Sequence, residues 1–474
     1  MSTSSKATSG RLWDKGGSLD ALVDRFTVGD DYLLDQRLAT ADCLATLAHA
    51  EMLCRVELVS AEELAELQAA LGSALQDIAA GSFAIQPEDE DVHTALERYL
   101  TRRTAAGEKV HTGRSRNDQV MAALRLYGRE AVLAVQADAL ELAGRLCALA
   151  ERYPELPMPG RTHLQPAMPS SVALWAQAFC EELLDDVQIL DGARRLTDRS
   201  PLGSAAGYGV PLPLDRELVA QRLGFDGVHH NVLAASNGRG KIEAVTLDAL
   251  EQLALTLSRL AQDLMLFSLK ELGYVSLPAE LCTGSSIMPQ KRNPDALELV
   301  RAKTATVHGY ASAVKGVLRA IPSGYQRDLQ ETKRPYLLGL AEVALMVRVM
   351  TATVSGLQIN DAALRAGMTP EVMATDRAYQ LVLEGVPFRQ AYRQVAEELR
   401  GGDLSAGWAA AGARVSTGSA ENLELASTAR QVTTAIEQVA ARREQIAEAL
   451  SALAGSPVSV LGASWPTAAA APAG

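Results

Sequence analysis

The 474-residue sequence has few aromatic residues, few cysteines and no long uninterrupted apolar run. Aromatic residues are only 4% of the chain, and its five cysteines are scattered without a C-x-x-C pair. This pattern is typical of reduced thiols in a cytoplasmic protein, and it excludes a disulfide framework and a zinc site. Because no apolar run reaches about 18 residues, we expect no membrane span.

The sequence also lacks an excess of basic residues. Its formal net charge is -12, which argues against nucleic acid as the main partner because phosphate neutralisation needs a basic face. The first ten residues are polar and contain no apolar core of a secretion signal. The final "SWPTAAAAPAG" is of low complexity, and we expect it to be disordered.

Helical periodicity dominates what remains. Apolar residues recur at spacings of three and four, whereas alternating strand patterns are few. The expected helices cover 38–56, 64–81, 118–152, 241–272, 294–320 and 329–355. Four long apolar-striped helices in the middle of the chain predict an all-α protein built on a helical bundle. Their broad apolar faces predict an oligomer, because a monomer would expose them.

Polar, glycine-containing joints divide the chain at 105–118 and 357–372. They predict three domains: an N-terminal helical domain (1–110), a central helical-bundle domain (111–362) and a C-terminal helical domain (363–474).

Three polar segments interrupt the helical pattern: "VHTGRSRNDQ" (110–119), "GRTHLQPAMPSS" (160–171) and "GSSIMPQKRNPD" (284–295). In the first, Asn117 or Asp118 can cap the long helix that follows, and the free N–H groups there suit a carboxylate. An ordinary charged cap is the alternative. In the second, two prolines restrain a polar turn around His163, which is suited to proton transfer or to a structural role.

The third segment combines small residues with cations. Gly284 and two serines provide mobility and backbone donors, and Lys291 and Asn293 can hold an anionic oxygen. These features predict an anion-binding lid, with a solvated loop as the alternative.

Together, these segments resemble one known group. "GSSIMPQKRNPD" is the signature of the fumarase/aspartase superfamily, and the chain resembles that superfamily throughout its length. "HTGRSRNDQ" and "RTHLQPAMPSS" have the form seen in the argininosuccinate lyase family. The same family is matched by "EDVHTALE" (90–97), "YQRDLQETK" (325–333) and "MATDRAYQLVLEGVPFRQAY" (373–392).

The resemblance implies a three-domain, all-α fold whose long-helix bundle is shared across a homotetramer. Each active site would combine the three polar segments from different chains, without a metal or organic cofactor. The implied reaction is a β-elimination that splits argininosuccinate into arginine and fumarate, a carbon–nitrogen lyase step of arginine biosynthesis. The implied catalytic residues are Ser285, His163, Lys291 and Asn293. Whether Ser285 or His163 takes the proton stays open at this point.

The resemblance also implies substrate contacts. Asn117 and Thr162 match positions that contact the succinyl part, and Tyr325, Gln330 and Lys333 match a Y-x4-Q-x2-K spacing that holds the amino-acid part. The remaining binding candidates are Asp31, His93, Arg116, Arg239 and Ser286.

Two departures bear on the identity of the leaving amine. Asp31 stands where many family members have serine, and "NGRGK" (237–241) stands where many read S-D-R-D. The alternatives are therefore a sister lyase that releases fumarate from another N-substituted aspartate, and a non-catalytic structural relative. Adenylosuccinate lyase is disfavoured by "HTGRSRND" and by the Tyr325–Lys333 pattern.

Overall fold

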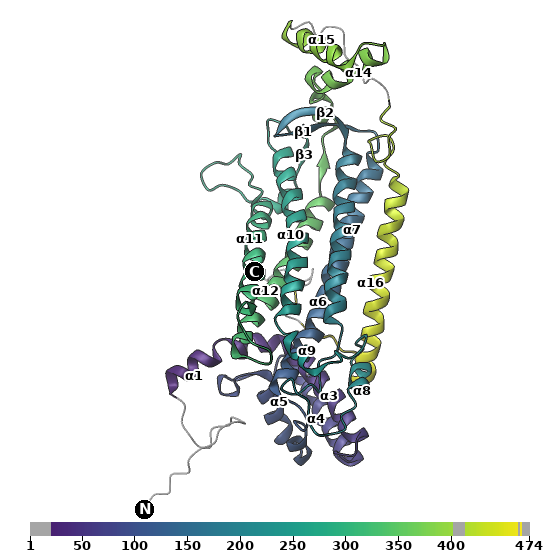
Figure 1. The fold of residues 1–474 in the computed structure, drawn as a ribbon. Coiled ribbons are helices and arrows are strands. Elements are labelled where there is room, and N and C mark those ends of the chain that lie inside the picture. The colour runs from purple at the N-terminus through teal and green to yellow at the C-terminus, as the bar shows by residue number, and fades with distance from the viewer. Residues whose placement is uncertain (1–19, 402–412, 463–464, 467–474) are drawn as a thin grey trace, which may run out of the picture.

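The computed structural model describes residues 20–401, 413–462 and 465–466, and it is an elongated helical bundle with smaller groups of helices at its two ends (Figure 1). Within this part of the chain the only sheets are two antiparallel pairs of strands. The expected disordered tail falls on residues outside those described, apart from the short piece at 465–466.

Short helices form the lower end of the molecule in Figure 1. They are α1 (Ala21–Val28), α2 (Asp31–Leu34), α3 (Ala39–Arg55), α4 (Ala61–Ala79) and α5 (Val92–Thr101). Helix α4 begins where Ser60 and Glu63 form a capping box, each side chain accepting the other's backbone N–H. Helix α3 is buried around most of its surface because it packs against α4, α6 and α8 (Arg216–Arg222).

Five long helices form the bundle: α6 (Arg116–Arg152), α7 (Val172–Thr197), α10 (Lys241–Phe267), α11 (Asp295–Leu318) and α12 (Lys333–Ser355). The four predicted long helices are confirmed, and α7 is a fifth long helix that was not among those expected. With 37 residues, α6 extends for about 55 Å. It therefore spans the molecule from its lower end to its upper end.

The start of α6 differs from the predicted cap. Ser115, not Asn117 or Asp118, is the N-cap residue, and Asp118 completes a capping box by accepting the Ser115 N–H at 2.8 Å. The other Asp118 oxygen accepts the N–H groups of Gly203 and Ala205, each at 2.9 Å. This buried carboxylate thus joins the start of α6 to the loop that follows α7. Burial raises its pKa to about 6.

The upper end of the bundle carries a hairpin of β1 (Pro157–Thr162) and β2 (Gln165–Ser171). His163 and Leu164 form its two-residue turn, and both have positive φ (53° and 61°), as a tight hairpin turn of the I′ kind requires. A second pair, β3 (Val275–Ser276) with β4 (Gln358–Ile359), lies nearby.

The C-terminal helices lie in two different parts of the molecule. The helices α13 (Asp361–Ala366), α14 (Ala374–Leu383) and α15 (Phe388–Gly401) follow β4, and α14 and α15 share a small apolar core of their own. Helix α16 (Leu425–Ala454) instead returns along the bundle against α6 and α7. The domain bounds expected from the sequence stay a prediction.

A buried carboxylate fixes the position of α16. Asp198, which is fully buried, accepts hydrogen bonds from Arg129 of α6 at 3.1 Å, Arg194 of α7 at 2.8 Å and Arg442 of α16 at 2.5 Å. A lone buried charge would be costly, so these arginines make its burial tolerable and tie three helices together.

Residues Arg327–Ser355, which include α12, are long and apolar enough to cross a membrane by composition alone. However, 56% of the residues in their most apolar window are buried inside the fold. That degree of burial is typical of a core helix in a bundle. Helix α12 is such a helix, because it packs against α6, α10 and α11.

Gly128 allows α6 and α12 to approach closely. A Cβ at this position would lie 1.7 Å from the Tyr336 hydroxyl oxygen, whereas one at Gly144 of the same helix would meet no described residue within 4 Å. We expect Gly128→Ala to lower the free energy of unfolding by about 1–3 kcal/mol through overpacking. Gly144→Ala should instead raise it by about 0.5–1 kcal/mol, as alanine does inside helices.

Denaturant unfolding followed by circular dichroism, at equal protein concentrations, measures both changes. Equal shifts in the same direction for the two variants would show that the contact between Gly128 and Tyr336 is not tight.

Candidate active site

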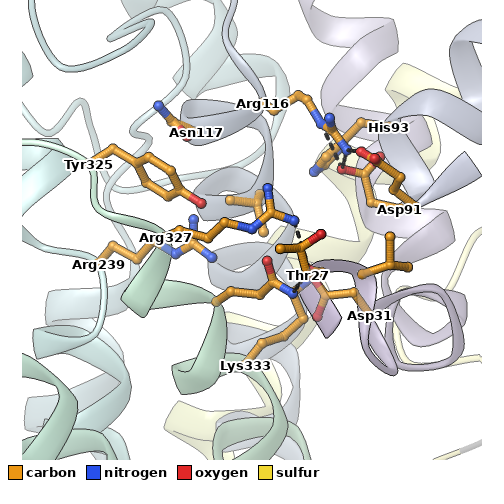
Figure 2. Close-up of a pocket in the computed structure, with 14 residues that line it drawn as sticks. Thr27, Asp31, Asp91, His93, Arg116, Asn117, Arg239, Tyr325, Arg327 and Lys333 are labelled. Atoms are coloured by element: carbon orange, nitrogen blue, oxygen red, sulfur yellow. Dashed lines mark hydrogen bonds and ion pairs between the residues drawn. The ribbon is translucent and has the colours of Figure 1, made fainter. Parts of the chain in front are cut away.

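A cavity of about 170 Å³ opens between the N-terminal helices, the start of α6 and the segment that leads into α12 (Figure 2). Eight of the ten predicted substrate-binding residues line it: Asp31, His93, Arg116, Asn117, Arg239, Tyr325, Gln330 and Lys333. They come from five separate stretches of sequence, so the fold brings together residues up to about 300 positions apart.

On one side of the cavity, Arg116 is already paired with two carboxylates. Its Nε donates to Asp91 Oδ2 at 2.8 Å, and its Nη2 donates to Glu90 Oε2 at 2.9 Å. Burial alone would raise the pKa of Asp91, but His93 and Arg116 hold it below its usual range. Arg116 therefore organises this wall, and two carboxylates offset its charge.

His93 is held by a buried carboxylate behind the wall. Its Nδ1 lies 2.7 Å from Asp42 Oδ1, and its buried Nε2 has no hydrogen-bond partner in the part of the chain that the structure describes. Burial alone would lower the pKa of His93, but Asp42 raises it above the ordinary value, with help from Asp91 and Asp35.

On the opposite side, Lys333 lies between two carboxylates. Its Nζ donates to Asp35 Oδ1 at 2.6 Å and is 3.1 Å from Asp31 Oδ2. Asp35 is fully buried and Lys333 is 2% exposed, so the group forms the floor of the cavity. Burial would lower the pKa of Lys333, but the two carboxylates raise it, and the lysine is therefore charged.

Two arginines add positive charge to the cavity without a hydrogen bond to a carboxylate among the described residues. Arg239 is 5% exposed, and its guanidinium lies 5.4 Å from the centre of the Tyr325 ring. Its buried Nε has no hydrogen-bond partner within residues 20–401, 413–462 and 465–466. Arg327 donates from Nη2 to the Thr27 carbonyl oxygen at 2.7 Å and points into the middle of the cavity (Figure 2). Arg327 was not among the predicted site residues, although its place between Tyr325 and Gln330 was a usable signal.

The other predicted site residues lie away from the cavity in the structure. Thr162 and His163 are in the β1–β2 hairpin at the upper end, beyond the far end of α6 from Asn117. Ser285, Ser286, Lys291 and Asn293 are in the loop that precedes α11, which stands away from the bundle (Figure 1). Within one chain the structure therefore does not bring these residues to the cavity.

The loop before α11 has a defined local geometry. Thr283 and Asn293 close it with two backbone hydrogen bonds of 3.0 and 2.9 Å. Ser285 Oγ accepts the N–H groups of Met288 at 3.1 Å and Ile287 at 3.4 Å. Donors aimed at a hydroxyl oxygen favour its ionised form, so this turn suits a serine that takes up a proton. Among the described residues, no group of three or more His, Cys, Asp or Glu side chains is placed to hold a metal ion.

Comparison with known proteins places these residues in a family. The sequence profile of a family described as lyase matches residues 15–309. The chain is 49% identical to an argininosuccinate lyase of Sorangium cellulosum, over 89% of this chain and 98% of the relative. It is 42% identical to an argininosuccinate lyase of Thermotoga neapolitana, over 82% and 98%, respectively.

Solved structures share the fold at lower sequence identity. An EDDS lyase in complex with formate superposes with a TM-score of 0.77 and 23% identity, covering 93% of this chain and 95% of that one. A fumarate lyase:delta crystallin from Brucella melitensis superposes with a TM-score of 0.67 and 20% identity, covering 89% of this chain and 93% of that one. The expected all-α architecture of the fumarase/aspartase type is confirmed.

The contact between His93 and Asp42 has a predictable pH dependence. Because the folded protein raises the pKa of His93, the pair stabilises the fold fully below the unfolded value of about 6.5. This contribution is lost as pH rises through the folded pKa. Asp42→Asn should therefore lower the denaturation midpoint most at pH 6, and the deficit should shrink as pH rises.

Glu251→Gln provides the control, because it removes the carboxylate from an exposed contact with His308. Water screens such a pair, so its effect on the midpoint should be small at each pH. A deficit of Asp42→Asn that grows with pH would contradict the charged histidine.

Proposed function

The chain belongs to the lyase family and, within it, to the argininosuccinate lyases, and on this premise we propose that it splits argininosuccinate into arginine and fumarate. The observation that carries the proposal is the cavity, where eight of the ten predicted substrate-binding residues converge, four of them (Asn117, Tyr325, Gln330 and Lys333) at positions matched to the family's substrate contacts. It offers uncommitted arginines for carboxylates and hydrogen-bonding groups for an amino acid, which suits a small molecule carrying several charges.

In the β-elimination, a proton leaves the carbon next to a carboxylate and the bond from the neighbouring carbon to nitrogen breaks. The carbon–carbon double bond of fumarate forms, and the departing guanidino nitrogen takes the electron pair and a proton. The intermediate carries extra negative charge on a carboxylate, and one prepositioned donor is worth about 3–4 kcal/mol in other enzymes. We assign this stabilisation to Lys291 and Asn293.

We assign removal of the carbon-bound proton to Ser285. Its hydroxyl oxygen already accepts two backbone N–H groups, which supports ionisation. A serine is a weak base at its ordinary pKa and needs such donors together with a nearby cation, for which Lys291 is the candidate. His163 then serves the leaving nitrogen as the second proton-transfer group, with Thr162 and Ser286 contacting the succinyl part.

We further propose that complete sites form only in a homotetramer. Helix α6 separates the hairpin of His163 from the cavity by about 55 Å, so another chain has to supply these residues. Large apolar side chains also stand exposed on the bundle, including Leu255 at 47%, Leu299 at 54% and Leu345 at 47%. Packing bundles together would cover them. We expect a cytoplasmic enzyme that works on a small molecule, without a nucleic-acid or membrane partner.

Incubating the purified protein with argininosuccinate and following the ultraviolet absorbance of fumarate tests the activity. Ser285→Ala should lower turnover at least about a hundredfold with an unchanged circular-dichroism spectrum, as expected for loss of a proton-transfer group. Ser73→Ala, which alters an exposed serine on α4, is the control and should keep wild-type turnover. Near-normal turnover of Ser285→Ala would move the role to Ser286 or His163.

Sharing of sites between chains predicts complementation. His163→Asn and Ser285→Ala should each be inactive alone. Mixing them under conditions that exchange subunits should restore partial activity, because some sites then contain both intact residues. Light scattering should show a tetramer, and a fully active monomer would refute the shared site.

A further inference from the structure

The charges lining the cavity divide into those that the protein itself satisfies and those that it leaves for a ligand. Arg116 is offset by Glu90 and Asp91 on one wall. On the floor, Lys333 is bound by both Asp31 and Asp35. One ammonium group against two carboxylates gives these three side chains one net negative charge.

That count changes the role expected for Lys333. A lysine that binds two carboxylates of its own chain is a poor site for a carboxylate of the substrate, because the incoming group would meet a net negative cluster. The cluster suits a cation instead. Asp35 is fully buried, whereas Asp31 lines the cavity and uses one oxygen for Lys333. Asp31 is therefore the member that can reach a ligand.

A cation stands beside this acidic floor. Arg327 and Gln330 both donate to the Thr27 carbonyl oxygen, at 2.7 and 3.0 Å, which fixes Arg327 next to the segment that leads into Asp31. No acidic partner of Arg327 occurs among the described residues, and Figure 2 shows its guanidinium between Tyr325 and Thr27. An acid and a neighbouring arginine are complementary to a zwitterion.

We propose that Asp31 accepts the α-ammonium group of the departing amino acid while Arg327 binds its α-carboxylate, so that the pair restricts the enzyme to amines carrying an α-amino acid end. Lys333 is then a positioning residue, which holds Asp31 in place and keeps it ionised. This inference rests on the proposed function, since it names how the same cavity chooses its leaving group.

The depth of the cluster sets the orientation. The reacting carbon–nitrogen bond has to lie near Ser285 and His163, which belong to other chains in the proposed assembly and enter from outside. The guanidino nitrogen is at that bond. The opposite end of arginine therefore points to the floor, where Lys333 is 2% exposed and Asp35 is fully buried. Asp31 consequently meets the α-ammonium group and not the guanidinium.

The reverse reaction tests this assignment, because fumarate can be offered with amines that differ at one end only. Arginine carries both groups, 5-guanidinopentanoate lacks the α-amino group, and agmatine lacks the α-carboxylate. Consumption of fumarate gives kcat/KM for each amine. The wild-type enzyme should favour arginine over either analogue by at least about tenfold, the low end for hydrogen bonds to charged groups.

Asp31→Asn should lower kcat/KM for arginine by about tenfold to a hundredfold and leave that for 5-guanidinopentanoate unchanged. Arg327→Gln should lower kcat/KM for both arginine and 5-guanidinopentanoate by a similar factor and leave that for agmatine unchanged. Asp30→Asn is the matched control, because Asp30 is the neighbouring exposed carboxylate, paired with Arg334, and it lies outside the cavity. It should leave all three values unchanged.

Equal losses for arginine and 5-guanidinopentanoate in Asp31→Asn would overturn the assignment, and so would an unchanged value for arginine. If a variant fails to fold, the wild-type enzyme still tests the assignment. Equal kcat/KM values of the wild-type enzyme for arginine and 5-guanidinopentanoate would also overturn it. Failure of the wild-type enzyme to cleave argininosuccinate is a separate result, which removes the proposed function and this inference with it.

Discussion

The length of α6 constrains everything else in this molecule. A rigid helix of 37 residues places its two ends about 55 Å apart, with the binding cavity at one end and the hairpin of His163 at the other. No bend of a loop within one chain can close that gap. The proposed role of His163 at this cavity therefore needs a partner chain, and the uncovered apolar side chains on α10, α11 and α12 favour such a partner.

Electrostatics explains why the cavity is built from pairs. Lys333 and Asp35 are almost completely buried, and an unpaired charge at either position would be costly. The protein meets that cost with its own counter-charges, and it does the same at Arg116. Among the described residues, this pairing leaves three groups for a ligand: Asp31, which uses one oxygen for Lys333, and Arg239 and Arg327, which have no acidic hydrogen-bond partner there.

Sequence patterns predicted the long helices because apolar spacing reports directly on which face of a helix is buried. They missed the N-cap at Ser115, since Asn117 and Asp118 are equally good caps by type and only the backbone shows where the helix begins. They also missed that α16 returns to the bundle, because this depends on Arg442 reaching Asp198, a contact between residues 244 positions apart. The members of the cavity were predictable only by resemblance. Asp31, Arg239 and Lys333 share no local pattern, and the topology alone brings them together.

The division of labour between the cavity and the loop before α11 follows from these constraints. The proposed binding of charged substrate groups requires side chains that do not reorganise, and the cavity has His93, Arg116 and Lys333 on α5, α6 and α12. Removing a proton from carbon requires exclusion of water, which a fixed open cavity cannot provide. The loop of Ser285 is exposed, with Ile287 at 82%, yet the pairing of Thr283 with Asn293 keeps its shape. In the proposed assembly, this locally ordered segment closes over another chain's cavity without disturbing the charges proposed to hold the substrate there.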